Sequence, residues 1–164
     1  MNYSLVEKKA SRQKRNYVPD LDGHLSQCES NFYLMVRLIP ELVDLHELKR
    51  DEQLQSLHWQ FQSQSVQLTF TVTDIARYTT TLNLTVKTPK VEVMRSGVLI
   101  VRIYHDAQML EVMEGPGPAA LRAIYENSAG GQTVDEKRQA NLFVGECLRA
   151  CYQAAQSQTT SSPL

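Results

Sequence analysis

The chain of 164 residues is 42% hydrophobic and 21% charged, with a formal net charge of −1, and this balance argues against a dedicated nucleic-acid-binding protein. No apolar run approaches the roughly 18 residues of a membrane-spanning helix, and the three cysteines lack the paired spacing of a disulfide framework. We therefore expect one reduced domain in the cytoplasm, with a sizeable core and without a membrane or nucleic-acid partner.

The first 16 residues form a basic extension. Five lysines and arginines stand against the single acid Glu7 in residues 1–15, which would suit an electrostatic arm for nucleic acid or anionic lipid. No aromatic or amphipathic stripe supports such an arm. We therefore favour a flexible, solvated terminus for residues 1–16.

Residues 25–39 have the apolar spacing of a helix, and one face collects Cys28, Phe32, Met35, Val36 and Ile39. The helix is predicted to begin at the capping box of Ser26 and Glu29, or one turn earlier at Asp22. Asn31 is expected to face solvent. Pro40 is then expected to kink or restart the helix, and a charged helix is predicted over 41–50.

Apolar and polar residues alternate strictly over 57–62, 66–73 and 79–86. This alternation predicts three antiparallel strands, each with one buried face and one wet face. Threonine dominates the wet face, which would suit a hydroxyl-lined binding surface. We favour an ordinary solvent face, because threonine has a high intrinsic preference for strands.

The most apolar run, 98–103, and a second run, 109–113, predict a β-hairpin with Asp106-Ala107 at its tip. This tip fixes the register of four pairs: Tyr104 with Met109, Ile103 with Leu110, Arg102 with Glu111, and Val101 with Val112. Because Arg102 and Glu111 fall directly opposite each other, we predict a cross-strand ion pair between them.

The first strand of this hairpin is apolar on both faces. The two faces hold Val98, Ile100 and Tyr104, and Leu99, Val101 and Ile103. Such a strand should be central in the sheet and covered twice. We place the stripe of Leu99, Val101 and Ile103 beside the threonine face, where a helix, a second copy of the chain or a partner must cover it. These three residues are the candidate interface.

A last helix is predicted over 134–155, starting at the capping box of Thr133 and Glu136. The polar residues 156–164 are expected to form a disordered tail, so the single folded domain spans 17–155. The predicted fold class is α+β, with a mainly antiparallel five-stranded sheet packed by an N-terminal and a C-terminal helix.

No motif for catalysis or cofactor binding stands out. Cys28, Cys147 and Cys151 would supply three thiols, but they coincide with apolar helix stripes, which favours buried free cysteines over a metal site. His105 beside Asp106 would suit an acid–base couple, although adjacent strand residues point to opposite faces. We assign no catalytic residue, no metal ligand and no cofactor.

Several blocks of the chain nevertheless form a recognisable pattern. They are Cys28-Glu29-x-Asn31-Phe32 with Arg37-Leu38-x-Pro40; Arg77-Tyr78-Thr79-Thr80; Val101-Arg102-x-Tyr104-His105-Asp106-Ala107 with Glu111-Val112; and Asp135-Glu136-Lys137-x-Gln139-x-Asn141-x-Phe143. The pattern runs from about residue 17 to residue 151 and resembles the YqiB-like proteins, a bacterial family of unknown function. The resemblance implies a cytoplasmic bacterial protein and supplies no activity.

Polar residues of the central blocks stand at element ends and would meet on one rim of the sheet. The candidate polar cluster is Arg77, Tyr78, Arg102, Tyr104, His105, Asp106 and Glu111. Together with the first amide groups of the helix after Thr133, Arg77 would hold a small acidic ligand.

Two functions come first, and a nucleic-acid binder that acts through the basic residues 1–15 comes third. The first is a non-enzymatic protein that associates with itself or with another cytoplasmic protein, since the doubly apolar strand requires cover. The second is a small-molecule or nucleotide-binding protein, with or without enzymatic activity, whose site lies at the 104–106 hairpin tip.

Overall fold

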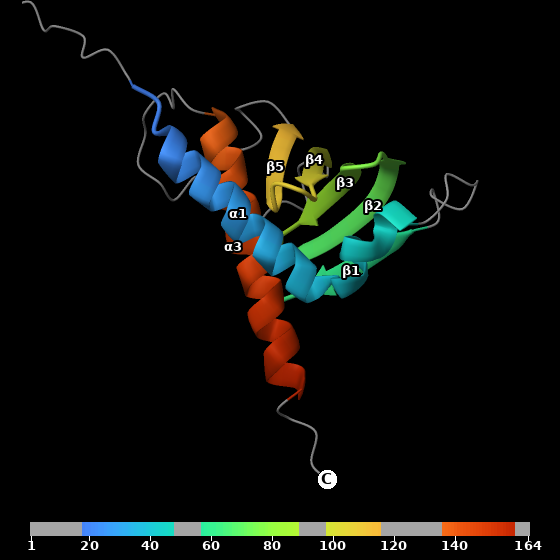
Figure 1. Ribbon diagram of the computed structural model, residues 1–164. Helices are drawn as coiled ribbons and strands as arrows, with labels where there is room; N and C mark the ends of the chain where they lie inside the picture. The colour runs from blue at the N-terminus through green and yellow to red at the C-terminus, as the bar shows by residue number, and fades with distance from the viewer. Residues whose placement is uncertain (1–17, 48–56, 89–97, 116–135, 160–164) are drawn as a thin grey trace, which may run out of the picture.

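The computed structural model describes residues 18–47, 57–88, 98–115 and 136–159, and it confirms the predicted α+β fold. Five antiparallel strands form one sheet in the order β1-β2-β3-β4-β5, with two long helices and a short 3-10 helix packed against it (Figure 1). The elements are α1 (Leu21–Leu38), η1 (Pro40–Glu47), β1 (His58–Gln62), β2 (Gln67–Ile75), β3 (Thr79–Lys87), β4 (Val98–Tyr104), β5 (Met109–Glu114) and α3 (Glu136–Thr159).

The first helix begins earlier than the capping box of Ser26 and Glu29 predicted. Asp20 is its N-cap, and the Asp20 side chain accepts a hydrogen bond from the Gly23 amide at 3.0 Å. A cap of this kind satisfies one of the amides that an α-helix leaves unpaired at its start. The α-helix ends at Leu38 and a new helical segment starts at Pro40, in line with the predicted restart, but this segment is 3-10 rather than α-helical.

The predicted register of the β4–β5 hairpin is confirmed. Tyr104 pairs with Met109, and the three further predicted pairs follow in order along both strands. The register shifts between Ile100 and Val101, which is typical of a β-bulge near the end of a strand pair.

The candidate interface of Leu99, Val101 and Ile103 is wrong, because these side chains belong to the core and are 2%, 0% and 1% exposed. Leu99 pairs with Leu84, and Val101 pairs with Leu82. Residues that face each other across an antiparallel pair share one face of the sheet. The stripe therefore lies on the buried face of β3, not on its threonine face, and the chain's own helices cover it.

The other face of β4 is less buried than predicted. Val98 is 47% exposed, and Ile100, Arg102 and Tyr104 are half-buried. Their neighbours on β3 are the threonines and Asn83. We name this side the outer face, as opposed to the core face that the helices cover.

The core lies between the core face of the sheet and the helices. Its fully buried large side chains come from every layer: Phe70, Leu68, Leu82, Leu84, Leu99, Ile103 and Leu110 from the strands, Met35, Ile39 and Leu42 from α1 and the segment after it, and Leu148 from α3. The alternation along β2 and β3 thus produces the single buried face that the sequence pattern predicted, whereas β4 has one buried face instead of the two predicted for it.

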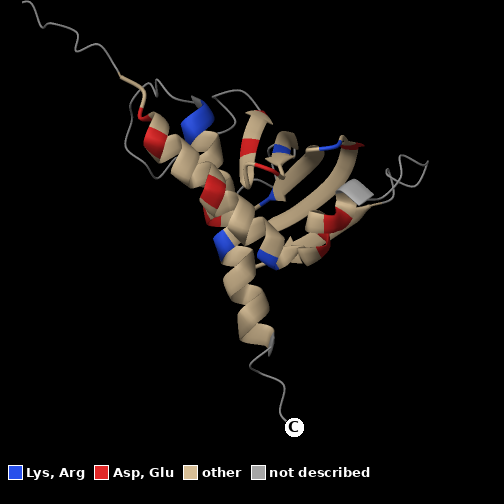
Figure 2. Cartoon of the chain, viewed as in Figure 1, with Lys and Arg blue, Asp and Glu red and all other residues tan. Residues whose placement is uncertain are grey.

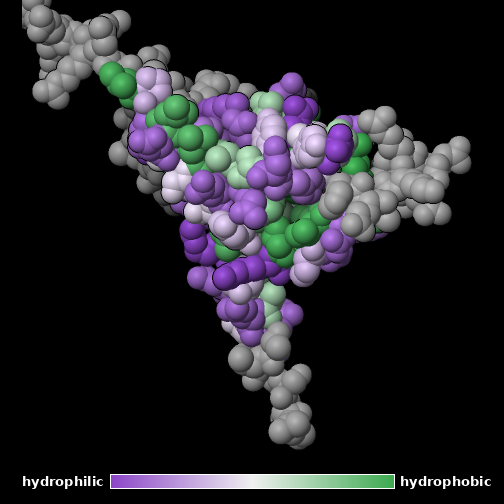
Figure 3. Space-filling model, viewed as in Figure 1, coloured by the Kyte–Doolittle hydropathy of each residue, from purple (hydrophilic) through white to green (hydrophobic). Residues whose placement is uncertain are grey.

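Large apolar side chains are exposed at the start of α1. Val18 is 81% exposed, Leu21 62% and Leu25 37%, and Figure 3 shows hydrophobic surface over these first turns. We name these three residues the α1 apolar patch.

The last helix continues to Thr159, so residues 156–159 are helical and do not belong to a disordered tail. Within this last turn, Ser157 Oγ donates to the Gln153 carbonyl at 2.9 Å. The basic extension over 1–16 and residues 160–164 lie outside the described residues. No helix of the described ranges combines the length and apolarity that a membrane crossing requires.

Candidate functional site

The described residues form two polar clusters. The hairpin rim consists of Arg77, Tyr78, Thr80, His105 and Asp106, at the turns after β2 and β4. The helix–strand junction lies between α1, α3 and β5. It consists of His24, Gln27, Cys28, Asn31, Glu111, Lys137 and Asn141.

The rim exists because β3 and β4 are antiparallel, with Thr79 opposite Tyr104. This pairing brings the β2–β3 turn and the β4–β5 turn to the same end of the sheet. The His105 amide donates to the Tyr78 carbonyl at 2.9 Å, and His105 Nε2 lies 2.8 Å from Oγ1 of the fully buried Thr80. Arg77 and His105 therefore share a rim, as the hypothesis of a polar cluster requires.

The charges of the rim are exposed. The Arg77 guanidinium lies over the Tyr78 ring, 5.0 Å from its centroid, and Tyr78 is 52% exposed. A cation stacked on an aromatic ring and a nearby imidazole suit a small anion. Asp106 is also exposed, and its charge opposes an anion.

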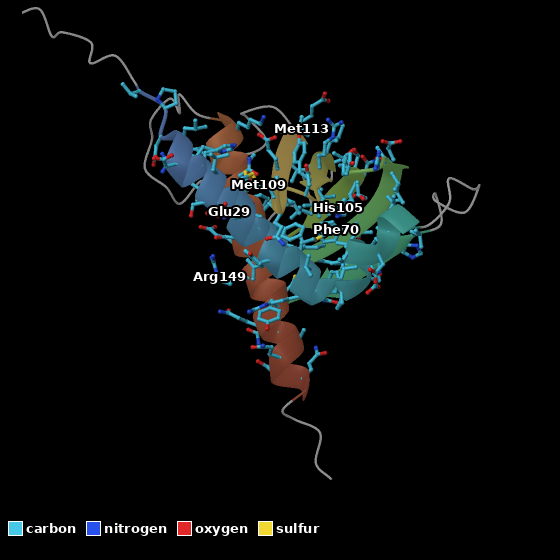
Figure 4. The ribbon with its side chains drawn as sticks, in the orientation of Figure 1. Glu29, Phe70, His105, Met109, Met113 and Arg149 are labelled. Atoms are coloured by element: carbon cyan, nitrogen blue, oxygen red, sulfur yellow. The ribbon has the colours of Figure 1, made fainter. Side chains whose placement is uncertain are left out.

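The start of α3 does not join this rim. Figure 4 shows Met109 and Met113 toward opposite ends of β5, with His105 near the Met109 end. The first described turn of α3 lies beside the Met113 end (Figure 1). Thr133 lies outside the described residues, and the predicted helix contribution to the rim is wrong for the turn that the structure describes.

Glu111 belongs to the junction rather than to the rim. It is opposite Arg102 in the register, as predicted, but its Oε1 accepts from Lys137 Nζ at 2.6 Å and lies 3.4 Å from His24 Nε2. Arg102 Nε instead donates to Thr81 Oγ1 at 3.3 Å. The predicted cross-strand ion pair is wrong, because β5 is an edge strand and its side chains reach the helices beside it.

The Lys137 and His24 contacts shift the titration of Glu111. Burial alone would raise the pKa, but the hydrogen bond and the charge of Lys137, helped by His24, outweigh it and hold the pKa of Glu111 below its ordinary value of 4.5. A carboxyl group whose pKa is lower in the folded state than in the unfolded state stabilises the folded protein at pH values above its unfolded-state pKa. This contribution is lost as the pH falls through the folded-state pKa.

We expect Glu111→Gln to lower the free energy of unfolding more at pH 7 than at pH 3, since only the ionised carboxylate is stabilised by the charge of Lys137. Urea unfolding of the wild type and the variant at both pH values measures the difference. Glu114→Gln is the matched control, because Glu114 is on the same strand and exposed. An equal loss for Glu111→Gln at both pH values would contradict the assignment.

Two buried asparagines hold the junction together. Asn31 and Asn141 are both 0% exposed, so the expectation that Asn31 faces solvent is wrong. Asn31 Nδ2 donates to the Asn141 carbonyl at 2.9 Å, and its Oδ1 accepts from Gln27 Nε2 at 2.8 Å. Asn141 Oδ1 accepts from the Val112 amide at 3.0 Å, while its Nδ2 donates to the Lys137 carbonyl at 2.8 Å. One side chain therefore links α3 to the edge of β5.

Cys28 lies in the same junction, with its Sγ 3.7 Å from His24 Nε2. A cysteine beside a histidine is the arrangement of an activated thiol. Here burial raises the pKa of Cys28 to about 11, and the Glu111 carboxylate adds to the effect. Burial also raises the pKa of Cys147 to about 12 and that of Cys151 to about 11. These protonated, buried thiols fit packing rather than nucleophilic chemistry.

No group of three histidine, cysteine or acidic side chains that would suit a metal ion occurs in the part of the chain that the structure describes. The junction was not predicted as a cluster. The sequence feature that points to the junction is a pair of polar residues, Asn31 and Asn141, each next to an apolar residue of a helix that the structure shows to be buried.

The junction also joins three of the blocks that carry the resemblance, through Cys28, Asn31, Glu111 and Asn141. Comparison with known proteins gives 29% identity over 139 residues to the uncharacterized protein YqiB of Escherichia coli K12, covering 84% of this chain and 91% of that protein. YqiB of Escherichia coli O157:H7 gives the same values. No solved structure matches.

A family model described as "protein of unknown function (DUF1249)" matches residues 41–157. The match begins within η1 and ends in the last turns of α3. It covers the whole sheet and the three junction residues on β5 and α3, whereas the four junction residues on α1 lie before it. Since it spans more than half of the chain, the protein belongs to the DUF1249 family of proteins of unknown function.

Proposed function

We propose that this protein acts without catalysis, by binding another polypeptide strand at the β1 edge of its sheet. The observation that supports the proposal is a difference between the two edges of the sheet. A strand edge presents unpaired backbone groups to which another chain can pair. One edge of this sheet is capped from within the chain, and the other presents outward backbone groups at Gln60 and Gln62 that have no partner among the described residues.

The β5 edge is the capped one. The Asn141 side chain accepts a hydrogen bond from the Val112 amide, and α1 and α3 pack along the strand through the junction. Covering an edge with helices in this way prevents it from pairing with another chain.

The β1 edge has a different arrangement. The Leu57 carbonyl accepts from the Val72 amide at 3.0 Å, and the Ser63 amide donates to the Val66 carbonyl at 2.8 Å. Inward and outward backbone groups alternate along an antiparallel strand, so the amides and carbonyls of Gln60 and Gln62 point away from β2. The structure gives these outward groups no hydrogen-bond partner among the residues it describes.

The β1 sequence has none of the features that usually prevent an edge strand from pairing with another chain. Natural edge strands are commonly protected by charged residues, proline or a bulge. The strand reads HWQFQ and carries no charged residue and no proline (Figure 2). Its pairing with β2 is regular throughout. The β1 edge is therefore competent to accept a further strand.

A photo-cross-linking residue at position 62 tests this proposal. Gln62 is exposed, so benzoylphenylalanine placed there in the full chain should give a cross-linked adduct on irradiation of intact cells. The adduct should disappear in a Gln60→Pro background, because proline removes the outward amide and is tolerated at a strand edge. The exposed Gln158 on α3 is the matched control position. Monomer alone from position 62, or an adduct that survives Gln60→Pro, would overturn the proposal.

A second candidate function is supported by the bond between His105 and Tyr78, which joins the two hairpin turns into one rim. A small acidic ligand, such as a nucleotide, would bind there through Arg77. We expect Arg77→Gln to weaken binding of adenosine diphosphate at least about tenfold, measured by calorimetry. Arg149→Gln is the matched control, because Figure 4 places Arg149 on α3, away from His105. Equal affinities of the two variants, or no binding to the wild type, would contradict this candidate.

A further inference from the structure

We propose that the strand added to β1 is β1 of a second copy of the same chain, so that two sheets join about a two-fold axis at Gln60. This inference rests on the proposed function, and it names the partner and the register. It follows from the backbone geometry, side chains and charge of β1.

The outward backbone groups select the register. In an antiparallel pair, a hydrogen-bonded pair of residues exchanges both its N–H···O bonds. Gln60 is the central residue of β1 and carries outward groups. A two-fold axis at this position places Gln60 opposite Gln60 of the partner subunit, with both bonds formed.

The same axis pairs the aromatic residues of β1. Trp59 falls opposite the partner's Phe61, and Phe61 falls opposite the partner's Trp59. These are non-hydrogen-bonded pairs, whose side chains approach each other most closely. Aromatic pairs at such positions are favourable. Each new pair would therefore extend the core face of one sheet into that of the next.

Both aromatic side chains are already held in place for this contact. Trp59 and Phe61 are half-buried and pack against the core. Trp59 Nε1 donates to Glu41 Oε1 at 2.7 Å. The Phe61 and Phe70 rings pack edge to face, with their centroids 6.3 Å apart. Little side-chain freedom remains to be lost when the second strand arrives.

Charge favours a second copy over a foreign peptide. Two-fold pairing sets each residue against a residue of the same strand, so a charged strand would repel itself. β1 is uncharged, and its glutamine amides each carry both donors and an acceptor. An uncharged strand gives an acidic or a basic peptide nothing to recognise.

Sedimentation of the full chain over about two decades of concentration tests the inference. We expect a reversible monomer–dimer equilibrium, since a contact between two five-residue strands is small and such contacts are weak. Gln60→Pro should raise the dissociation constant at least tenfold, with the circular dichroism spectrum unchanged. Gln60→Thr keeps the amide and should still dimerise.

A disulfide tests the register directly. Directly opposed hydrogen-bonded residues have Cα atoms about 5.5 Å apart, a distance that a disulfide spans. Gln60→Cys should therefore form a covalent dimer under mild oxidation, while the native cysteines stay buried. Gln62→Cys is the matched control, because the same axis places its two copies about 14 Å apart.

Three results would overturn the inference. In sedimentation, these are a wild type that is monomeric at every concentration, or a dimer that survives Gln60→Pro but is lost in Leu21→Ser at the α1 apolar patch. In the oxidation experiment, it is an equal yield of covalent dimer from both cysteine variants. A monomeric chain that still gives a Gln60-dependent cross-link to another protein would reject self-association while leaving strand addition intact. The absence of both would reject both proposals.

Discussion

Replacing Asn141 with leucine is expected to lower the free energy of unfolding by about 3 kcal/mol, because it leaves the buried Val112 amide without its hydrogen-bond partner. The Val112 amide and the Lys137 carbonyl both bond to this side chain. Asn141 is 0% exposed, so water does not readily replace the lost bonds. For a domain of this size the midpoint of thermal unfolding should fall by about 10 °C.

Urea unfolding followed by circular dichroism measures the change. Asn83→Leu is the matched control: Asn83 is half-buried on the outer face of β3, and the change there should stay below about 1 kcal/mol. Amide hydrogen exchange adds a local readout, since Val112 should lose its protection before the centre of the sheet does. Equal stability of the two variants would mean that Asn141 does not secure the β5 edge.

The second large effect is expected at Gly145, where the usual rule for glycine in a helix should be reversed. Alanine in place of glycine normally stabilises a helix by about 1 kcal/mol. A Cβ at position 145 would lie 2.6 Å from Asn31 Oδ1 and closer still to Gln27 Nε2. Asn31 cannot easily withdraw, because its Nδ2 is bonded to the Asn141 carbonyl.

We expect Gly145→Ala to destabilise the protein by about 1 kcal/mol and Gly145→Val by about 3 kcal/mol, because overpacking grows with side-chain volume. Thermal unfolding of both variants measures the series. Ala154→Val, in a half-buried part of the same helix, controls for the cost of a branched residue in a helix and should stay below about 1 kcal/mol. A Gly145→Ala variant that is more stable than the wild type would show that the two helices separate readily at this point.

The sheet was predictable because each strand carries its own pattern. Alternation defined β1, β2 and β3, and the short turn at Asp106 fixed the register of β4 against β5. The pairing of β3 with β4 was different, since the long connection between them does not constrain register. A shift of one residue moves every side chain to the other face. This is why Leu99, Val101 and Ile103 were placed beside the threonines rather than beside Leu82 and Leu84.

The candidate site was only partly predictable. The rim followed from element ends, so Arg77 and His105 were correctly brought to one end of the sheet. The junction depends on how α1 crosses α3, which no local pattern in either helix specifies. Asn31 resembles a solvent-facing residue until Asn141 is placed against it. The β1 edge was likewise hidden, because alternation reports which face is buried and not which strand is outermost.

The β5 edge is synthesised before the side chain that caps it, because translation proceeds from the N-terminus. Val112 is synthesised 29 residues before the Asn141 side chain that covers it, and Asn31 precedes Asn141 by 110 residues. During translation all five strands leave the ribosome before α3, so the Val112 amide at the β5 edge has no cap until Asn141 follows. A polypeptide that ends before α3 would leave this amide uncapped permanently. Such a fragment would be a template for aggregation, whereas a chain that includes α3 closes that edge.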